Sequence, residues 1–328
     1  MFAQAANCQR LKDDFCGECE ACQKIMRLAD TKPLIERGLV ERGESADAAT
    51  VERTPLILES HPDVWTIVPD PVRQKTPVAR PVIRMGQLRA VQRAAYFLPE
   101  ARRRVFILDG ADTMRRDYSD IFLKILEEPP PTSTLILLAN SAQALQPTIR
   151  SRCLQFYFAP VSAPSIEEFL KQRTEHEARE RKLIAQLSAG SPGLALEIDL
   201  PESQRLRRDV LRFFESAVTG KNYREVFALT AQIAKKEKES FENILELFYS
   251  LLTDLLELSH GPKNFVPRNS DLRRELETLG KKTDLDWIER AVGNLDQLQN
   301  RLRRNINRQL ALDALASSLR APLNPPPA

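Results

Sequence analysis

The run from Arg104 to Cys153 constrains the fold more than any other part of the chain. It contains two short apolar segments, residues 105–108 and 135–139, and the first of them ends at Asp109. A helix-forming stretch lies between these segments and stops at Pro129, because proline cannot continue a helix. Short apolar runs that alternate with a helix predict a parallel sheet covered by helices. We therefore expect an α/β core.

Two arginines close this unit, in the sequence Thr-Ile-Arg-Ser-Arg-Cys of residues 148–153. The guanidinium group is always charged and is rarely buried without a partner. Arg150 and Arg152 are therefore candidates to bind a phosphate or another acidic group, which could belong to a neighbouring subunit.

Composition predicts a globular protein of two or three domains. The 328 residues are 42% hydrophobic and 28% charged, and no apolar run reaches the roughly 18–20 residues of a membrane helix. The N-terminus lacks a signal-peptide pattern, so we expect a cytoplasmic protein. The net charge of +3 gives no argument for nucleic acid by itself. We interpret basic clusters, such as residues 102–104 and 303–304, as solvated surface.

Four of the five cysteines lie close together near the start of the chain: Cys8, Cys16, Cys19 and Cys22. In a cytosolic protein this spacing indicates a metal site rather than disulfides. Four thiolates suit tetrahedral Zn²⁺, and a closed site of this kind leaves no position open for a substrate. An iron–sulfur site and a redox pair of cysteines are the alternatives.

Patterns elsewhere predict two further strands, a helical remainder and one surface segment. Residues 31–60 are charged and mixed, so we expect a surface insertion there, and His61 is interpreted as a turn residue rather than a metal ligand. Residues 163–196 predict a small helical domain, and the last residues, 324–328, predict a disordered tail. The expected strands are 64–68, 105–108, 135–139 and 154–158, and the expected helices include 85–98, 205–218, 223–236, 241–258, 271–279, 284–298 and 302–319.

The sequence Leu-Lys-Ile-Leu-Glu-Glu-Pro-Pro of residues 123–130, followed by Ser151-Arg152-Cys153, resembles the AAA+ subunits of bacterial clamp loaders. These proteins open the ring-shaped sliding clamp and load it on primed DNA. Residues 302–312 are similar to the family's asparagine-containing collar helix. Weaker motifs extend the resemblance over most of the chain.

The resemblance implies an α/β plus all-α architecture. Residues 1–160 would form a truncated AAA+ RecA-like parallel sheet, with a zinc module at 8–22 and the surface insertion at 31–60. A helical lid would follow in 161–201, then a helical collar or oligomerisation domain in 202–322 and a disordered tail in 323–328. Clamp-loader subunits carry a similar four-cysteine module, which implies structural zinc at Cys8, Cys16, Cys19 and Cys22.

Three features of ATP-hydrolysing relatives are missing. The chain has no Gly-x-x-x-x-Gly-Lys-Ser/Thr loop to cradle phosphates. Asp109-Gly110 stands where an Asp-Glu pair would handle Mg²⁺ and water, and no arginine stands near Gly193. These losses resemble the non-hydrolysing delta-prime subunits, so we expect no ATP bound by this chain as given and no catalytic activity of its own.

In that family the arginine of the Ser-Arg-Cys motif reaches the ATP γ-phosphate held by the adjacent subunit. The resemblance therefore implies that Arg152 is an arginine finger in trans, with Ser151 and Cys153 as its motif. Arg150 could assist it, cap a helix or face solvent. We expect Cys153 to be a small buried residue at a strand start and Glu127 to have a structural role.

The implied partners are the gamma/tau-type ATPase subunits and the delta subunit, with the sliding clamp and primed DNA reached through the complex. All belong to the DNA polymerase III holoenzyme, a DNA-directed DNA polymerase and hence a nucleotidyltransferase complex. Residues 2–8 resemble the end of the helix that follows the phosphate loop. We therefore expect the family's first strand and phosphate loop to be missing, through a late start codon or a fragment.

Two other functions compete with this interpretation. A truncated gamma/tau-type ATPase subunit is disfavoured by Gly110 and Gly193. A zinc-containing nucleic-acid-binding protein unrelated to clamp loading would carry basic and aromatic residues around its cysteines. Acidic residues surround them instead, and these disfavour phosphate contact: Asp13, Asp14, Glu18 and Glu20.

Overall fold

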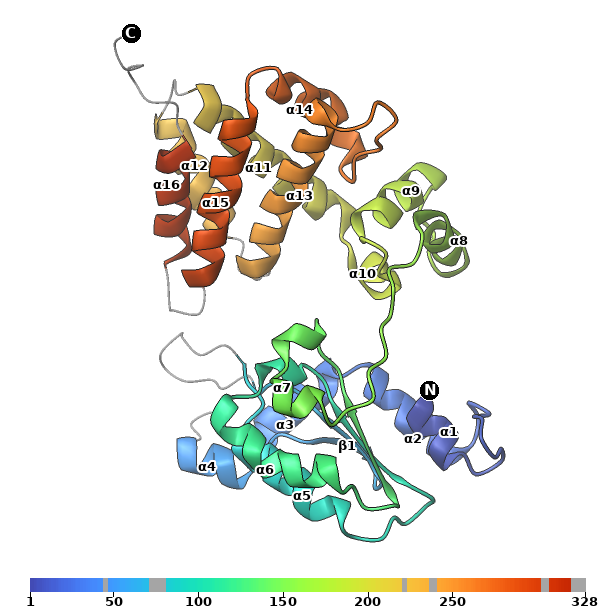
Figure 1. The fold of residues 1–328 in the computed structure, drawn as a ribbon. Coiled ribbons are helices and arrows are strands. Elements are labelled where there is room, and N and C mark those ends of the chain that lie inside the picture. Colours follow the sequence, from blue (N-terminus) through green and yellow to red (C-terminus); the bar gives the residue numbers. More distant parts are fainter. Residues whose placement is uncertain (44–46, 71–80, 220–222, 236–240, 302–306, 320–328) are drawn as a thin grey trace. The chain divides into compact units, whose positions relative to one another are not determined.

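The computed structural model describes residues 1–43, 47–70, 81–219, 223–235, 241–301 and 307–319 (Figure 1). The chain divides into two compact units, Met1–Tyr157 and Phe158–Ala328. Among the described helices, none combines the length and the apolar character that crossing a membrane requires.

A four-stranded sheet forms the centre of the first unit, in the order β1-β2-β3-β4. The strands β2, β3 and β4 are parallel, and β1 joins β2 in an antiparallel hairpin. Val64 lies opposite Val105, and Phe106 lies opposite Leu135. Three of the predicted strands, near 64–68, 105–108 and 135–139, are thus confirmed as neighbours in a parallel sheet. The strands are β1 Leu58–His61, β2 Val64–Ile67, β3 Arg104–Leu108 and β4 Ser133–Leu137.

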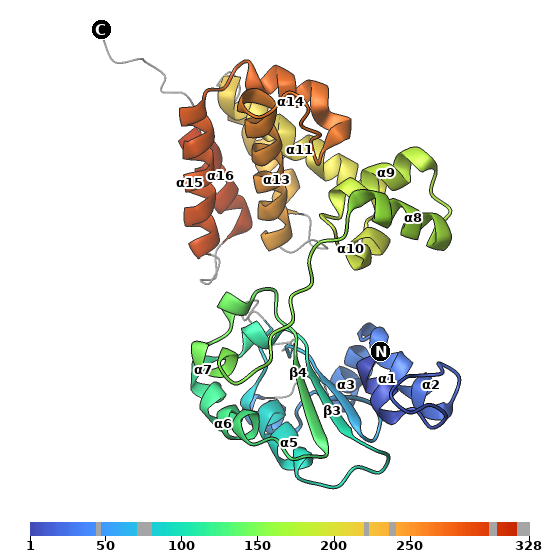
Figure 2. The ribbon, with the colours of Figure 1, turned by 45° about the vertical axis from the view of Figure 1, so that its right-hand side comes forward.

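Helices cover both faces of this sheet. Because successive side chains of a strand point to opposite faces, Phe106 packs with Leu88 and Phe122 of α5 and α6, whereas Val105 packs with Ala3 and Ile25 of α1 and α2. Figure 2 shows α5 and α6 on one side of β3 and β4, and α1 and α2 on the other. The helices are α1 Phe2–Asn7, α2 Glu20–Met26, α3 Lys32–Arg42, α4 Ala48–Arg53, α5 Met85–Ala95, α6 Arg116–Glu127 and α7 Pro147–Arg150.

The segment 31–60 differs from the surface insertion that the sequence predicts. It contains α3, α4 and the edge strand β1, and it buries Val51, Leu56 and Leu58. Leu56 and Leu58 pack with Val68 in a small apolar cluster. The apolar residues of this charged segment come in short groups, such as residues 56–58, that show no regular strand or helix period, so their burial was not evident from the sequence.

The strand predicted at 154–158 is wrong. These residues form no strand and pair with none of the described strands. Leu154, Phe156 and Phe158 are strongly exposed, at 82%, 75% and 95%. An apolar run becomes a strand only where a neighbouring strand accepts its backbone hydrogen bonds, and this run finds no such neighbour among the described residues.

The second unit contains helices throughout its described part, as predicted. Phe213, Phe214, Phe248 and Trp287 meet edge-to-face at the centre of its main apolar cluster, with ring centroids 5.2 to 5.8 Å apart. The helices are α8 Ala163–Arg173, α9 Ala178–Leu187, α10 Pro192–Glu197, α11 Leu200–Thr219, α12 Tyr223–Ala234, α13 Phe241–His260, α14 Arg273–Gly280, α15 Leu285–Arg301 and α16 Arg308–Leu319.

Helices α8, α9 and α10 share a smaller cluster, which includes Ile166, Leu170 and Ile184. The predicted division of this unit into a lid and a collar remains a prediction. The predicted tail at 323–328, and the first five residues of the helix expected at 302–319, lie outside the described residues.

Candidate functional site

The structure brings together the four cysteines that the sequence singled out. Cys8 follows α1, Cys16 lies in the next loop, Cys19 caps α2 and Cys22 lies in its first turn. Their sulfur atoms all lie within 4.8 Å of one another. Gly17, at φ +74°, supplies a left-handed turn that an L residue rarely adopts, and this turn brings Cys16 back towards Cys19.

Backbone N–H groups donate hydrogen bonds to the sulfur atoms at two of these positions. The Leu11 N–H donates to Cys8 Sγ and the Cys19 N–H donates to Cys16 Sγ, both over 3.3 Å. Burial by itself would raise the pKa of Cys8, but backbone donors, the Leu11 N–H foremost, bring this pKa down to about 6. Burial raises the pKa of Cys22 to about 12. A bound cation would overcome this raised pKa, because a coordinating thiol is deprotonated outright.

The donor set fits a structural metal site. Tetrahedral coordination with metal–sulfur bonds of about 2.3 Å needs sulfur atoms about 3.8 Å apart. The four sulfur atoms, all within 4.8 Å of one another, are compatible with this geometry. Cys8, Cys19 and Cys22 are buried, so the cluster is shielded from solvent on most sides. Four thiolates complete the coordination shell and leave no open position.

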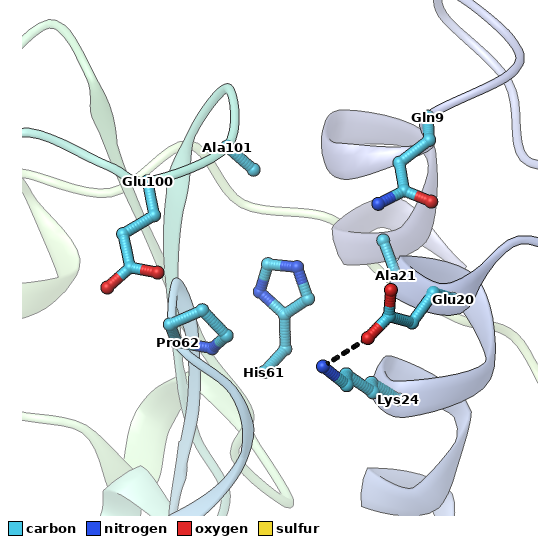
Figure 3. A pocket seen from close by; sticks show the side chains of 8 residues that line it. All are labelled: Gln9, Glu20, Ala21, Lys24, His61, Pro62, Glu100 and Ala101. Carbon is cyan, nitrogen blue, oxygen red and sulfur yellow. Dashed lines mark ion pairs between the residues drawn. The ribbon is translucent and has the colours of Figure 1, made fainter.

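A shallow pocket of about 190 Å³ lies between α2 and the β1–β2 hairpin (Figure 3). His61 ends β1 and is buried, and its Nδ1 accepts a hydrogen bond from the Asp63 N–H over 3.1 Å. Burial lowers the pKa of His61. Lys24 and Glu20, one turn apart on α2, form an ion pair of 2.6 Å on the helix side of the pocket. The lining residues are Gln9, Glu20, Ala21, Lys24, His61, Pro62, Glu100 and Ala101.

Asp63 ties this hairpin to the loop before β3. Its buried carboxylate accepts the N–H groups of Glu100 and Ala101 over 3.0 and 2.6 Å. His61 is the last residue of β1 and pairs with Val64, so it lies directly before the hairpin turn and not in it, which corrects that part of the expectation. It is not part of the cysteine cluster.

Arg152 lies at the surface beyond α7, held by residues of two segments. Its Nε donates to Glu127 Oε1 over 2.6 Å, and its Nη1 donates to the Thr148 carbonyl over 2.9 Å. Ser151 Oγ lies 3.3 Å from Nη1 and donates to the same carbonyl over 3.2 Å. The guanidinium is thus anchored but still reachable from solvent, since the side chain is 31% exposed.

Arg150 and Cys153 take separate positions. Arg150 Nη1 makes a long contact of 3.5 Å with the Ala142 carbonyl, so the two arginines use different partners. Cys153 is partly buried against the main apolar cluster of the first unit, and this burial raises its pKa. It does not begin a strand, which corrects that part of the expectation.

The partnership of Arg152 with Glu127 was missed by sequence reasoning. The two residues are 25 positions apart, and an acidic residue at a helix end carries no local signal of a long-range pair. The helix termination at Pro129 was the available clue, because it turns the chain back towards β4 and α7.

The backbone at Gly110 suits glycine. Gly110 is left-handed at φ +72°, and a Cβ placed there would lie 2.9 Å from Pro69 Cγ. A glutamate at this position would be strained and crowded in this conformation. Both the backbone conformation and the contact with Pro69 therefore favour glycine after Asp109.

Comparisons with known proteins agree over both units. A family model described as "DNA polymerase III, delta subunit" matches residues 1–162, and the model "DNA polymerase III, delta subunit, C terminal" matches residues 201–319. The delta-prime subunit of Pseudomonas aeruginosa is 27% identical over 320 residues, which cover 92% of this chain and 80% of that protein. The delta-prime subunit of Escherichia coli is 24% identical, covering 81% of this chain and 76% of that protein.

The Escherichia coli tau subunit is 32% identical, but over only 31% of this chain and 17% of that protein. The matches define a subunit of the bacterial replication machinery. The chain belongs to the delta-prime subunit family of DNA polymerase III, a clamp-loader family. The family is thus confirmed, and the alternative of an unrelated zinc-containing nucleic-acid-binding protein was wrong.

Proposed function

We propose that this chain is the non-hydrolysing stator of a sliding-clamp loader and supplies Arg152 in trans to a neighbouring ATPase subunit. In this role it works in the cytoplasm, within the DNA polymerase III holoenzyme. Its partners are gamma/tau-type ATPase subunits and the delta subunit, and it reaches the sliding clamp and primed DNA through the complex. It hydrolyses no ATP itself.

The position of Arg152 is the observation that carries this proposal. Its guanidinium is surface-accessible, anchored by backbone and side-chain acceptors, and bound to a carboxylate rather than buried. A planar guanidinium bridges phosphate oxygens and neutralises the charge that develops during phosphoryl transfer. Such a finger contributes on the order of 10³–10⁵ in rate in well-measured phosphoryl-transfer enzymes.

Zinc is the metal that we propose for the cysteine cluster, held by Cys8, Cys16, Cys19 and Cys22. The ion would fix the loop 8–22 against α1 and α2 and would take no part in ATP turnover. The all-sulfur donor set and the closed coordination support a structural ion.

We also propose that the first unit corresponds to the AAA+ RecA-like domain, residues 161–201 to the lid and residues 202–322 to the collar. The separate apolar clusters of α8–α10 and α11–α16 support this division of the helical unit.

The test is ATP turnover of the loader reconstituted with its own ATPase subunit, clamp and primed DNA. Arg152→Ala should lower single-turnover hydrolysis at the adjoining site by on the order of 10³-fold, while pull-down of the ATPase subunit persists. Arg37→Ala is a matched control, because Arg37 also pairs with a glutamate on an exposed helix. Unchanged turnover with Arg152→Ala would remove the trans-acting role.

A further inference from the structure

Glu127 occupies the edge of Arg152 that is best suited to bind a phosphate. Arg152 Nε and Nη2 lie 2.6 and 2.5 Å from the same oxygen, Glu127 Oε1. At such an edge, two parallel N–H groups of a guanidinium can donate to two oxygens of a carboxylate or a phosphate. In the free chain, the Glu127 carboxylate therefore lies where a phosphate oxygen would bind.

The other donors of Arg152 are also largely engaged. Nη1 faces the Thr148 carbonyl at 2.9 Å and Ser151 Oγ at 3.3 Å. A guanidinium has five N–H groups. These acceptors leave one of them, on Nη2, without an acceptor in this set of contacts. A phosphate that takes the Nε–Nη2 edge has to displace Glu127.

We infer that Glu127 is a positioning residue: it holds Arg152 in an ion pair that keeps the guanidinium from binding phosphate until a neighbouring subunit presents ATP. This inference rests on the proposed function, since it assumes that Arg152 meets a phosphate in trans. The carboxylate neutralises the finger and orders its side chain in the free chain. The γ-phosphate of the neighbour then displaces it, because phosphate carries more negative charge than one carboxylate.

The effect of this ion pair on phosphate binding is modest, because both side chains are accessible to solvent. The Arg152 side chain is 31% exposed and that of Glu127 is 50% exposed, so water and salt weaken the pair. An exposed ion pair of this strength weakens the binding of phosphate to Arg152 by a factor of about two to five. Removing the carboxylate should raise turnover at the adjoining site by that factor.

Glu127→Gln tests this directly in the reconstituted loader, because it keeps the shape and removes the charge. We expect single-turnover hydrolysis to rise about two- to five-fold at low salt, and the ratio to wild type to approach one as salt screens the pair. Glu128→Gln is the matched control, since it removes the adjacent exposed charge that caps the same helix. Turnover that is unchanged or lowered by Glu127→Gln would overturn the inference.

A double-mutant cycle separates this role from damage to α6. In an Arg152→Ala background, Glu127→Gln should leave the residual turnover unchanged, because no finger remains to be released. An equal effect in both backgrounds would show that Glu127 acts through the helix and would overturn the inference. Thermal midpoints of both glutamine variants should match wild type, and Glu127→Ala should repeat the rise. The proposed function fails separately, if Arg152→Ala alone leaves turnover intact.

Discussion

Each of the two units of this chain has its own core, and the two cores are built differently. In the first unit the apolar core is divided among several small clusters on the two sides of a four-stranded sheet, and a cysteine cluster and a buried aspartate join its loops. In the second unit, one continuous cluster links α11 to α16 around interlocking aromatic rings. The two units therefore differ in how their apolar cores are distributed, in separate clusters in the first and mainly in one large cluster in the second.

Asp63 illustrates the specific contacts of the first unit. This nearly inaccessible carboxylate accepts two backbone N–H groups. Both oxygens of Asp70 accept from Nη1 of Arg42, at 2.9 and 2.8 Å. Such groups cost stability heavily when one partner is lost. The second unit has its own buried arginine, Arg207, which pairs with Asp271 and also contacts Asn269.

Metal removal should produce the largest difference between the units. Chelation, or Cys22→Ser, should destabilise the first unit by several kcal/mol, because metal binding energy to four thiolates is folding energy, and about 10–16 kcal/mol is found in zinc-finger peptides. The second unit should keep its unfolding transition. Metal content and thermal unfolding of the full chain provide the measurement.

Cys153→Ser is the matched control for this prediction, since Cys153 lies outside the cluster of four sulfurs. Full metal content in Cys22→Ser, or identical unfolding of the first unit with and without chelator, would contradict it.

The second unit should respond most to loss of aromatic area. Phe214 is fully buried and its ring meets Phe213, Phe248 and Trp287. Phe214→Ala should lower the free energy of unfolding of this unit by about 3–5 kcal/mol, through lost burial and the cavity left behind. Urea unfolding followed by tryptophan fluorescence and circular dichroism measures it.

Phe227→Ala serves as the control, because Phe227 is 41% exposed and its loss should cost far less. If Phe214→Ala instead moves the unfolding transition of the first unit, the two units do not behave independently.

A smaller effect on the stability of the first unit should appear as pH falls. Burial lowers the pKa of His61 below its ordinary value of 6.5, so the folded first unit prefers the neutral imidazole. Below about pH 6.5 the unfolded chain binds a proton that the folded chain does not, and stability decreases until the folded pKa is passed. His61→Asn should remove this part of the acid sensitivity, since its Oδ1 can still accept from the Asp63 N–H.

The measurement is the free energy of unfolding of the first unit between pH 5 and 8. Wild type and His61→Asn should show parallel behaviour above pH 7 and diverge below it. Parallel curves at every pH would show that burial of His61 has no effect on stability.

Local pattern was enough for much of the fold. The apolar strands around Val64, Phe106 and Leu135 were predictable, because each is a short apolar run bounded by turn residues. The cysteine cluster was predictable from spacing alone. The strand β1 was missed because its four residues, Leu-Glu-Ser-His, carry too few apolar positions to show a period.

The sequence by itself determined which residues form the parallel strands β2, β3 and β4 and that the second unit is helical. It also determined which cysteines gather and to which family the chain is similar, since these depend on local spacing and short motifs. Only the tertiary structure decided that residues 154–158 form no strand and are exposed, and that Leu56 and Leu58 are buried. It also decided that Glu127 forms an ion pair with Arg152. The reason is physical: strand pairing, burial and ion pairs need a partner from elsewhere in the chain, and no local pattern specifies which one it meets.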